Sequence, residues 1–482
     1  MAKDSVATTS LAYDQMKADY WDQIDALRGT TVALRSLGKT YLPKHAKEED
    51  TQWRYRRDRS FLYPAYDDAI TRMAGKPFAK PVTVSENMPE ALLEIVDNAD
   101  LTGRNLTMFA RDVLDEGCSV GLTHVLVDYA NTGGGQSMGE EQTLGLRPVF
   151  IHYKSRDVWG WESRRLPSGV KVPAEVRLHE ESTERVGNYN EVTVQRVRVY
   201  RERDFEVHRL MDDGEWMLEI PPTPHTYPDG VPFRTFYTNQ TGFMTAKPPL
   251  WGLADLNLQH WQIASDYANV IHVVSSPVLM VTGASEDQVR SFTAGAGRMV
   301  VLPEGADMKW VEHTGMAVDA GRDELDKIEG RMRVLAMSPY LERGSATNQT
   351  AMANAIHEGK SQSWVQMTVK LLEAFLLDLF WVASRWRGIE LPEDASVEVY
   401  SDFTLGTAGS TDLDTIRQFR QAGDIDRETA LFELKRRGVL SESAEIEEIL
   451  ERIEQEGPDL SSLIPPVVED EDEEEEEEED EE

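Results

Sequence analysis

A helix, a compact insert, a second helix, a polar loop and a very long helix follow one another between Trp251 and Gly388. This order constrains the fold more than any other feature of the chain. Apolar residues recur at spacings of three and four through each helical part. In chain order we predict a helix over Trp251–Val274, an insert over about Val278–Ala317, a helix over Arg322–Met337, a loop over Ser338–Thr350 and a helix over Ala351–Gly388. Such an order is unusual for a soluble enzyme, and we interpret it as helices that line a channel in a ring.

The two helices beside the insert carry apolar stripes. The first is apolar on two sides, which predicts that it packs against two neighbours. Pro248 and Pro249 favour an extended lead-in to it, and Pro277 ends it. We expect an antiparallel helix pair with a small α/β insert at its outer end. The side chains expected to pack the pair are Leu253, Leu256, Trp261, Ile263 and Tyr267 of the first helix and Leu325, Ile328 and Met332 of the second.

The residues before this region predict an α+β fold. Helical spacing dominates up to about Arg104, for example over Ala12–Leu27 and Phe61–Met73. A helix from Leu106 that ends near Gly117 precedes a buried strand over Thr123–Tyr129. Short runs of β-type residues then alternate with turns, which indicates an antiparallel sheet. These runs are FIHY from Phe150, EVRLH from Glu175, VTVQRVRVYRE from Val192, EVHRL from Glu206 and VPFRTFY from Val231.

The C-terminal part predicts helices and then an acidic tail. A helical hairpin is expected over Asp412–Leu440 with its turn at Gly423, followed by a charged helix over Ser443–Gln455. The run Glu469–Glu482 consists of fourteen Asp and Glu residues, and its self-repulsion predicts disorder. It accounts for −14 of the net charge of −36, so the rest of the chain carries −22. Such a surface repels nucleic acid phosphates and disfavours tight DNA binding.

Composition places the chain in a reducing compartment. Cys118 is the single cysteine and cannot form an intrachain disulfide, and the sequence opens with no secretory signal pattern. The most apolar stretch, Leu371–Trp386, is interrupted by charged residues, so no transmembrane span is expected. We predict a globular chain without a membrane partner.

None of the patterns that resemble catalytic motifs is complete. Gly38, Lys39 and Thr40 resemble the end of a phosphate-binding loop, but Ala33 stands where that motif needs glycine. His260 and His272 are too far apart to ligate one metal, and His260 is interpreted as a packing histidine. Asp67 and Asp68 lack a second carboxylate cluster that would complete a nuclease site. The hairpin at Gly423 superficially resembles a DNA-reading helix-turn-helix, and a structural hairpin is favoured. We therefore predict no enzyme activity, no metal and no cofactor.

Several segments together resemble the portal proteins of tailed bacteriophages. The resemblance covers about residues 60–456, and its specificity lies in the order of the segments because none of them is catalytic. The segments are YPAYDDAITRMAGKPF from Tyr63, DVLDEGCSVGLTHVLVDY from Asp112, SRDVWGWE from Ser155, LADLNLQHWQIASDYANVIH from Leu253 after PPL, SSPVLMVTG from Ser275 and AGDIDRETALFELKRRGVL from Ala422. The Gly133–Gly135 loop and the acidic tail are not explained by it.

The resemblance implies a ring, typically of twelve subunits, at one vertex of the capsid. Its parts would be an N-terminal wing at 1–248, stem helices at 249–276 and 319–338, a clip at 277–318, a second part of the wing at 339–405 with a tunnel loop at 338–350 and a long helix at 351–388, a crown at 406–456 and a disordered tail at 457–482. Arg343, Asn348 and Gln349 of the tunnel loop would face DNA.

The resemblance also implies partners and a location. Double-stranded DNA would pass through the channel during packaging and ejection, driven by the terminase large subunit docked on the clip. The major capsid protein and head-completion or adaptor proteins would be the other partners, and the ring would be assembled in the host cytoplasm and reside in the virion. Two alternatives stay open: a non-ring head adaptor or scaffold protein, and a DNA-packaging nuclease or ATPase.

Overall fold

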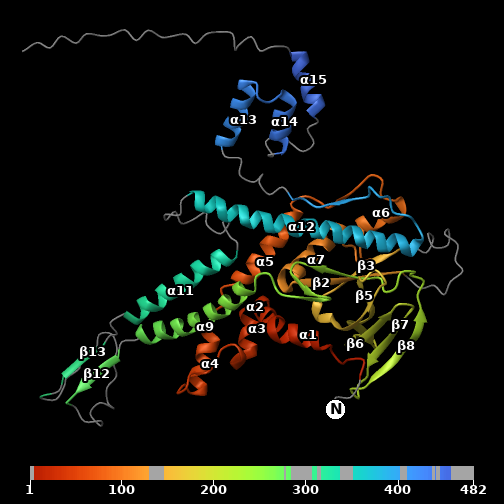
Figure 1. Ribbon diagram of the computed structural model, residues 1–482. Helices are drawn as coiled ribbons and strands as arrows, with labels where there is room; N and C mark the ends of the chain where they lie inside the picture. The colour runs from red at the N-terminus through yellow and green to blue at the C-terminus, as the bar shows by residue number, and fades with distance from the viewer. Residues whose placement is uncertain are drawn as a thin grey trace, which may run out of the picture. The chain divides into compact units, whose positions relative to one another are not determined.

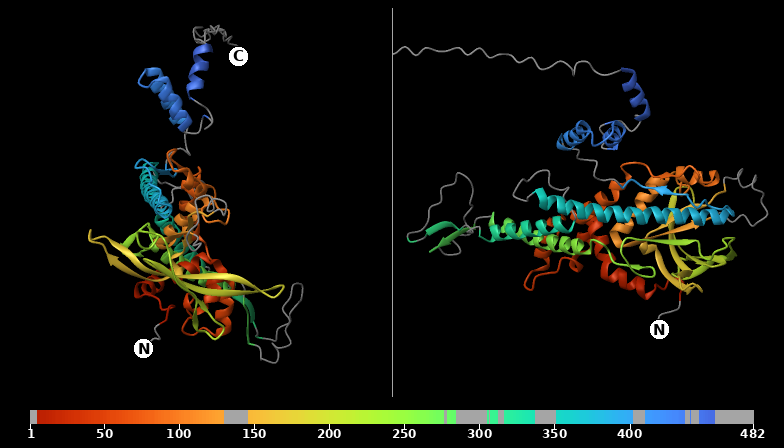
Figure 2. Two further views of the ribbon diagram at one scale, coloured as in Figure 1. Left: turned by 90° about the vertical axis from the view of Figure 1, so that its right-hand side faces the viewer. Right: turned by 45° about the horizontal axis from the view of Figure 1, so that its top comes forward.

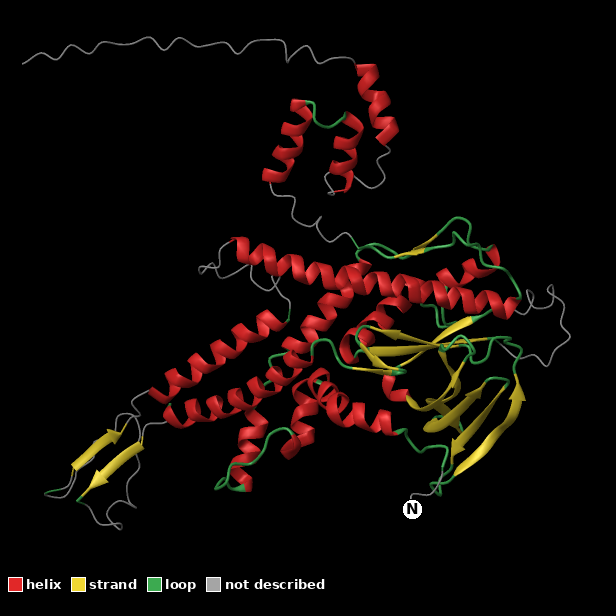
Figure 3. Cartoon of the chain, in the orientation of Figure 1, coloured by secondary structure: helices red, strands yellow, loops and turns green. Residues whose placement is uncertain are grey.

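The computed structural model describes residues 5–129, 146–275, 278–283, 305, 307–311, 316–336, 351–401, 410–436, 440 and 446–456. The chain divides into two compact units, Met1–Ser401 and Asp402–Glu482. The first unit combines helices with antiparallel sheets, so the predicted α+β fold class is confirmed (Figures 1 and 3).

Short helices make up the N-terminal part of the first unit. The expected helix over Ala12–Leu27 is one continuous run from Leu11 to Arg28 with a π-helical turn inside it. The elements are α1 (Leu11–Met16), η1 (Lys17–Trp21), α2 (Asp22–Arg28), α3 (Thr30–Leu37), η2 (Gly38–Thr40), α4 (Asp50–Arg59), α5 (Ala65–Gly75), η3 (Lys76–Phe78), α6 (Glu90–Asp97) and α7 (Leu106–Val120). The helix expected from Phe61 begins at Ala65 instead, because Pro64 is suited to the residue before a helix and the preceding residues are extended.

Two antiparallel sheets follow. The smaller has the order β3-β2-β9 and the larger the order β4-β5-β6-β7-β8. The strands are β2 (Leu122–Asp128), β3 (Val149–Tyr153) and β9 (Phe233–Tyr237) in the smaller sheet, and β4 (Val158–Arg165), β5 (Lys171–Val186), β6 (Asn190–Arg201), β7 (Asp204–Leu210) and β8 (Trp216–Pro224) in the larger. A short 3-10 turn, η4 (Ser155–Asp157), links β3 to β4. The five predicted runs all form strands, whereas β4 and β8 were not among them.

Alternation along the strands of the smaller sheet separates its two faces. On β9, Phe236 packs its ring 5.4 Å from that of Phe375 on the long helix α12 (Ala351–Arg387). Phe233, three residues earlier, points to the opposite face and belongs to a buried cluster with Val176 and Leu178 of the larger sheet. Helix α12, the small sheet and the large sheet therefore form three successive layers (Figure 2).

Helix α7 approaches the small sheet closely because it carries glycine at the contact. A Cβ on Gly117 would lie 2.8 Å from ring carbons of Phe236. Gly121 ends the helix with φ of +96°, and a Cβ there would lie 2.6 Å from the carbonyl oxygen of Lys247. Glycine is the residue that adopts this left-handed conformation without strain. The strand β2 can therefore begin immediately at Leu122.

The helix–insert–helix region has the expected order. Helix α9 covers Trp251–Val274, the bounds predicted from the sequence, and α11 covers Met316–Leu335. Strands β12 (Val278–Thr282) and β13 (Asp307–Val311) of the insert pair antiparallel. The start of α11 was predicted six residues too late, because Asp319 as well as Asp323 supplies a carboxylate suited to a first helical turn. The part of the insert at 284–304 lies outside the described residues.

Two pairs of short strands complete the first unit, and the elements described in the second unit are helices. Strand β1 (Thr83–Val84) pairs with β14 (Val397–Glu398), and β10 (Gln240–Gly242) pairs with β11 (Thr245–Ala246). In the second unit, α13 (Ser410–Ala422) and α14 (Arg427–Arg436) form the predicted hairpin, with Gly423 at φ of +82° in the turn. A third helix, α15, covers Ile446–Glu456.

Candidate functional site

Helix α9 is fixed to the N-terminal helices by hydrogen bonds from its own side chains. The carboxamide of Asn257 accepts from the backbone N–H of Tyr66 at 2.9 Å and donates to the carbonyl of Tyr63 at 2.8 Å. Farther along, Gln262 donates to the carbonyl of Tyr41 at 2.6 Å. Asn257 is fully buried. This face of α9 is therefore occupied within the chain.

A buried guanidinium makes the next contact along the same face. Arg56 of α4 is 3% exposed, and its Nε lies 2.8 Å from Glu48. Its Nη1 lies 3.0 Å from Asp266 of α9, and its Nη2 donates to the carbonyl of Pro43 at 2.8 Å. The hydrogen bond from Arg56 lowers the pKa of Glu48. The positive charge and the N–H groups of Arg56 thus both have partners, as burial of an ion pair requires.

The opposite face of α9 packs against α11 in antiparallel fashion. The contacts proceed from Tyr267 with Gly321, through His260 with Glu329, to Gly252 with Leu335. A Cβ on Gly321 would lie 2.6 Å from the Tyr267 ring, so glycine allows the helices to approach there. One side of α9 therefore packs against the N-terminal helices and the other against α11.

The structure places the predicted packing residues in two groups. Leu253, Trp261, Ile328 and Met332 are fully buried. Half-buried are Leu256, Ile263, Tyr267 and Leu325. Arg343, Asn348 and Gln349, predicted to face DNA, lie outside the described residues.

His260 fits its interpretation as a packing histidine. It is 5% exposed, its Nε2 lies 3.3 Å from Glu329, and its ring centroid is 5.7 Å from that of Tyr63. Among the residues that the structure describes, no three His, Cys, Asp or Glu side chains are grouped so that they could hold a metal.

The segment that resembles a phosphate-binding loop has other contacts. Gly38–Thr40 forms a 3-10 turn directly after helix α3, not after a strand. The Lys39 ammonium lies 3.4 Å from Asp50 and 5.4 Å from the centroid of the Trp53 ring. The exposed Lys39 ammonium is therefore already paired with groups of the same chain.

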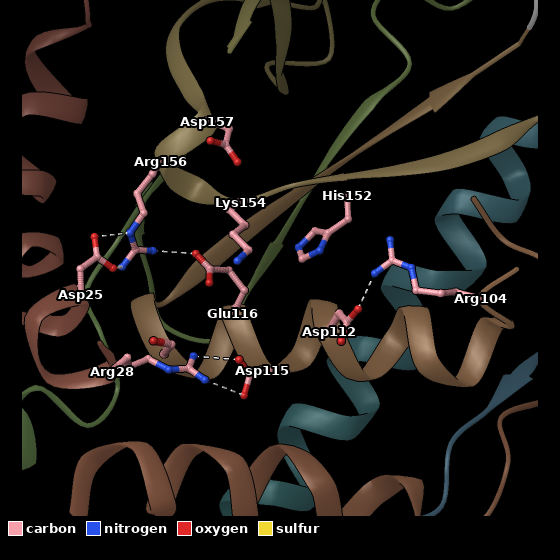
Figure 4. Close-up of a pocket in the computed structure, with 11 residues that line it drawn as sticks. Asp25, Arg28, Arg104, Asp112, Asp115, Glu116, His152, Lys154, Arg156 and Asp157 are labelled. Carbon is pink, nitrogen blue, oxygen red and sulfur yellow. Dashed lines mark hydrogen bonds and ion pairs between the residues drawn. The ribbon is translucent and has the colours of Figure 1, made fainter. Parts of the chain in front are cut away.

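A charged cavity of about 650 Å³ lies where α2, α7 and the β3–η4 segment meet (Figure 4). Its lining is almost entirely ionisable. The lining residues are Asp25, Arg28, Arg104, Asp112, Asp115, Glu116, Ser119, His152, Lys154, Arg156 and Asp157. This cavity was not predicted from the sequence, because the residues that line it come from segments far apart in the chain.

Ion pairs link the walls of the cavity. Arg28 of α2 reaches both carboxylate oxygens of Asp115 on α7, at 2.8 and 3.2 Å. Arg156 of η4 lies 2.7 Å from Glu116 on α7 and also contacts Asp25 of α2 (Figure 4). Bidentate arginine–carboxylate pairs fix orientation as well as distance. These ion pairs thus connect helices α2 and α7 to the turn that follows strand β3 of the small sheet.

Burial controls protonation at the cavity wall. Desolvation raises the pKa of Glu116, although Arg156 opposes this effect. It lowers the pKa of His152 to about 4, and nearby Lys154 adds to this shift. His152 Nε2 lies 2.7 Å from the Thr123 hydroxyl. The arrangement pairs nearly every guanidinium with a carboxylate, which suits a structural joint better than acid–base chemistry.

Comparisons with known proteins point to one uncharacterised family and to particle structures. A family model described as a domain of unknown function (DUF4055) matches residues 249–387, the span that contains α9, the insert, α11 and α12. No curated protein matches the chain.

Solved structures with similarity to the chain come from gene transfer agent (GTA) particles. A chain in the neck of an empty GTA particle has a TM-score of 0.41 and 13% identity, covering 78% of this chain and 90% of its own length. A chain from the virion of a native GTA particle has a TM-score of 0.40 and 13% identity, covering 76% and 88%. In the part of the chain that the structure describes, no helix is long and apolar enough to cross a membrane.

Proposed function

We propose that this chain is a structural subunit of a tailed-phage-type particle, and specifically the portal protein that forms a ring at one capsid vertex. The observation that carries the proposal is the antiparallel pair α9–α11, joined through the β12–β13 insert and followed by the 37-residue helix α12. This is the element order of stem, clip, stem and long wing helix in the portal proteins that the sequence resembles. The crown would correspond to the helices after residue 406.

The ring is proposed to contain twelve subunits and to enclose a channel for double-stranded DNA during packaging and ejection. The net charge of −36 supports a conduit, since an acidic wall repels phosphates and does not hold them. In this scheme the insert at 277–318 docks the terminase large subunit. The wing contacts the major capsid protein, and head-completion or adaptor proteins bind the assembled ring.

The contacts of α9 favour a rigid stem base. One face of the helix is hydrogen-bonded to α5 and α4 through Asn257 and Asp266, while the other packs on α11. A subunit that forms a symmetric ring needs a fixed angle between the parts that contact its neighbours. Anchoring of α9 at both faces supplies that rigidity.

Native mass spectrometry and negative-stain imaging of the purified full-length chain test the proposal. Twelve copies of a 54.5 kDa chain have a mass of about 654 kDa, and end-on views should show a closed ring with a central opening. A chain that stays monomeric under all salt conditions would contradict it. A discrete non-ring oligomer would favour an adaptor or scaffold, and ATP hydrolysis by the pure protein would revive the packaging-enzyme alternative.

A further inference from the structure

The long helix α12 carries large apolar residues on its solvent side as well as on its buried side. Phe375 and Leu379 pack inward. On the outer side, Met367 is 53% exposed, Leu371 44% and Trp381 39%. Large apolar side chains grouped on one face of a helix often mark an interaction surface. This outer side, which we call the α12 face, has no cover among the residues that the structure describes.

The spacing of the α12 face fits a second helix. Its positions alternate steps of four and three residues, which is the seam of a helix that packs along another helix. The positions are Met367, Leu371, Ala374, Asp378, Trp381 and Arg385. From the first to the last they span about 27 Å at a rise of about 1.5 Å per residue.

Trp381 is held in place before any partner arrives. The guanidinium of Arg234 lies 5.8 Å from its ring centroid and that of Arg385 lies 6.0 Å away. Asp378 binds Arg234 at 2.6 Å, and Asp229 binds Arg385 at 2.6 Å. Tryptophan and arginine are the residue types that most often dominate interface energetics, and pre-ordered side chains lose less entropy on binding.

The local charge of the α12 face favours a second copy as the partner. Charged residues on and beside it balance, in a chain whose net charge is −36. They are Lys370, Arg234 and Arg385 against Glu373, Asp378 and Asp229. Two strongly acidic copies can approach only where like charges do not meet. A neutral, apolar helix face meets that condition.

The area of the face also bears on the size of the partner. A strip about 27 Å long and about 10 Å wide covers roughly 270 Å², whereas a stable interface buries about 800 Å² per partner. The α12 face is therefore the centre of a contact that extends beyond it. A folded chain can supply that larger contact, and a short peptide cannot.

We propose that the α12 face, centred on Leu371 and Trp381, is a subunit–subunit contact on which a helix of a second copy of this chain packs. This inference rests on the proposed ring and adds to it the surface through which adjacent subunits meet. The contact buries the apolar side of α12 and places the Trp381 ring and its two guanidinium groups at the interface.

Substitution of one exposed apolar residue by glutamate tests the contact. Leu371→Glu places a charge in the α12 face without touching the core, and Met108→Glu, at a 55% exposed position on α7, is the matched control. Sedimentation velocity of the full chain should show loss of at least 90% of the oligomer for Leu371→Glu and wild-type assembly for Met108→Glu. Circular dichroism and thermal unfolding of the monomer check that both variants fold.

A cysteine-protection experiment reads the same surface without disturbing assembly. Leu371→Cys and the control Met108→Cys are reacted with a maleimide in separated oligomer and monomer fractions, since the native Cys118 is buried. Protection of position 371 by tenfold or more in the oligomer only, with position 108 reactive in both, is the expected result. Equal reactivity of position 371 in both fractions, with normal assembly of Leu371→Glu, overturns this inference and leaves the ring proposal intact.

Two other outcomes also decide the matter. If position 371 is protected even in the monomer, the chain covers its own α12 face and the inference is wrong. If neither wild type nor control assembles under any condition, the ring proposal falls, and the subunit contact falls with it.

Discussion

The carboxamide oxygen of Asn257 accepts a hydrogen bond at 2.9 Å from the backbone N–H of Tyr66, a residue 191 positions earlier in the chain. The amide nitrogen of the same side chain donates to the carbonyl of Tyr63 at 2.8 Å. One buried polar residue thus joins the centre of α9 to the start of α5. The Tyr66 N–H is buried and has no water as an alternative partner, whereas Tyr63 is partly exposed and its carbonyl also accepts from the N–H of Ala65 at 2.8 Å.

Replacement of Asn257 by alanine should destabilise the first unit by about 2 kcal/mol or more. Each buried polar group left without a partner costs about 1–3 kcal/mol. The substitution leaves the buried N–H of Tyr66 unpaired and also removes the hydrogen bond to the Tyr63 carbonyl. Chemical denaturation of the full chain measures the change. Gln259→Ala, at an exposed position on the same helix, is the control and should change stability by less than about 0.5 kcal/mol. Equal effects of the two substitutions would refute the anchoring role.

Two glycines of α11 should respond in opposite ways to alanine. Gly330→Ala meets nothing within 4 Å and should stabilise by up to about 1 kcal/mol through helix propensity. Gly321→Ala places a methyl group 2.6 Å from the Tyr267 ring, so it should destabilise despite the same gain in propensity. Melting temperatures of the two variants test this. A higher melting temperature for Gly321→Ala would show that α9 and α11 are not closely packed there.

The ion pairs at Arg56 and at Lys44 should differ in energetic weight. Arg56→Met leaves the Glu48 carboxylate, whose side chain is 9% exposed, without its main partner, and should cost about 3 kcal/mol. Lys44→Met removes an ion pair with Asp50, whose side chain is 61% exposed, and should cost much less because solvent screens the pair. Urea unfolding of both variants gives the comparison. Similar losses would mean that Glu48 gains solvent or another donor when Arg56 is absent.

Stability should fall as the pH decreases from about 6.5. Burial lowers the pKa of His124 to about 3, with a contribution from His152, whose own pKa is lowered to about 4. The unfolded chain therefore binds protons that the folded chain excludes, and the stabilisation present above pH 6.5 is lost toward pH 3. Glu116 acts in the opposite direction, because burial raises its pKa.

Unfolding free energies measured between pH 7 and pH 4.5 test this dependence. His124→Asn should flatten the slope, since asparagine can replace the 3.0 Å contact with the Thr235 hydroxyl and does not titrate in this range. Gln259→Ala, at an exposed position and without a titratable group, should leave the slope unchanged. A wild-type slope in His124→Asn would exclude His124 as a source of the acid sensitivity.

Local signals allowed much of the fold to be predicted. The bounds of α9 follow from its proline lead-in and its helical spacing, and the turn at Gly423 follows from glycine between two apolar repeats. Strand β8 was missed because Pro221 and Pro222 argue against a central strand. It is an edge strand, where the missing N–H groups disrupt no ladder. Its identity depends on its position in the sheet, which no local pattern reveals.

The charged cavity shows where local patterns are insufficient. Arg28 and Asp115 are 87 residues apart, and each lies on a helix whose exposed face is expected to carry charges. Nothing in either helix distinguishes a charge that faces a partner from one that faces water. For α12, the apolar spacing predicted the helix itself. Which side of that helix remains exposed could be read only from the structure.

The free edges of both outer strands of the five-stranded sheet are protected over part of their length. Beside β4, the N–H of Ser10 donates to the carbonyl of Trp159 at 2.8 Å, and β8 carries prolines at 221, 222 and 224. Unprotected strand edges are the sites at which crowded proteins polymerise without limit. A particle subunit is synthesised in many copies that meet one another in a small volume. In the proposed ring, protection of these edges leaves helical surfaces, which have a defined size and end, to determine how many copies join.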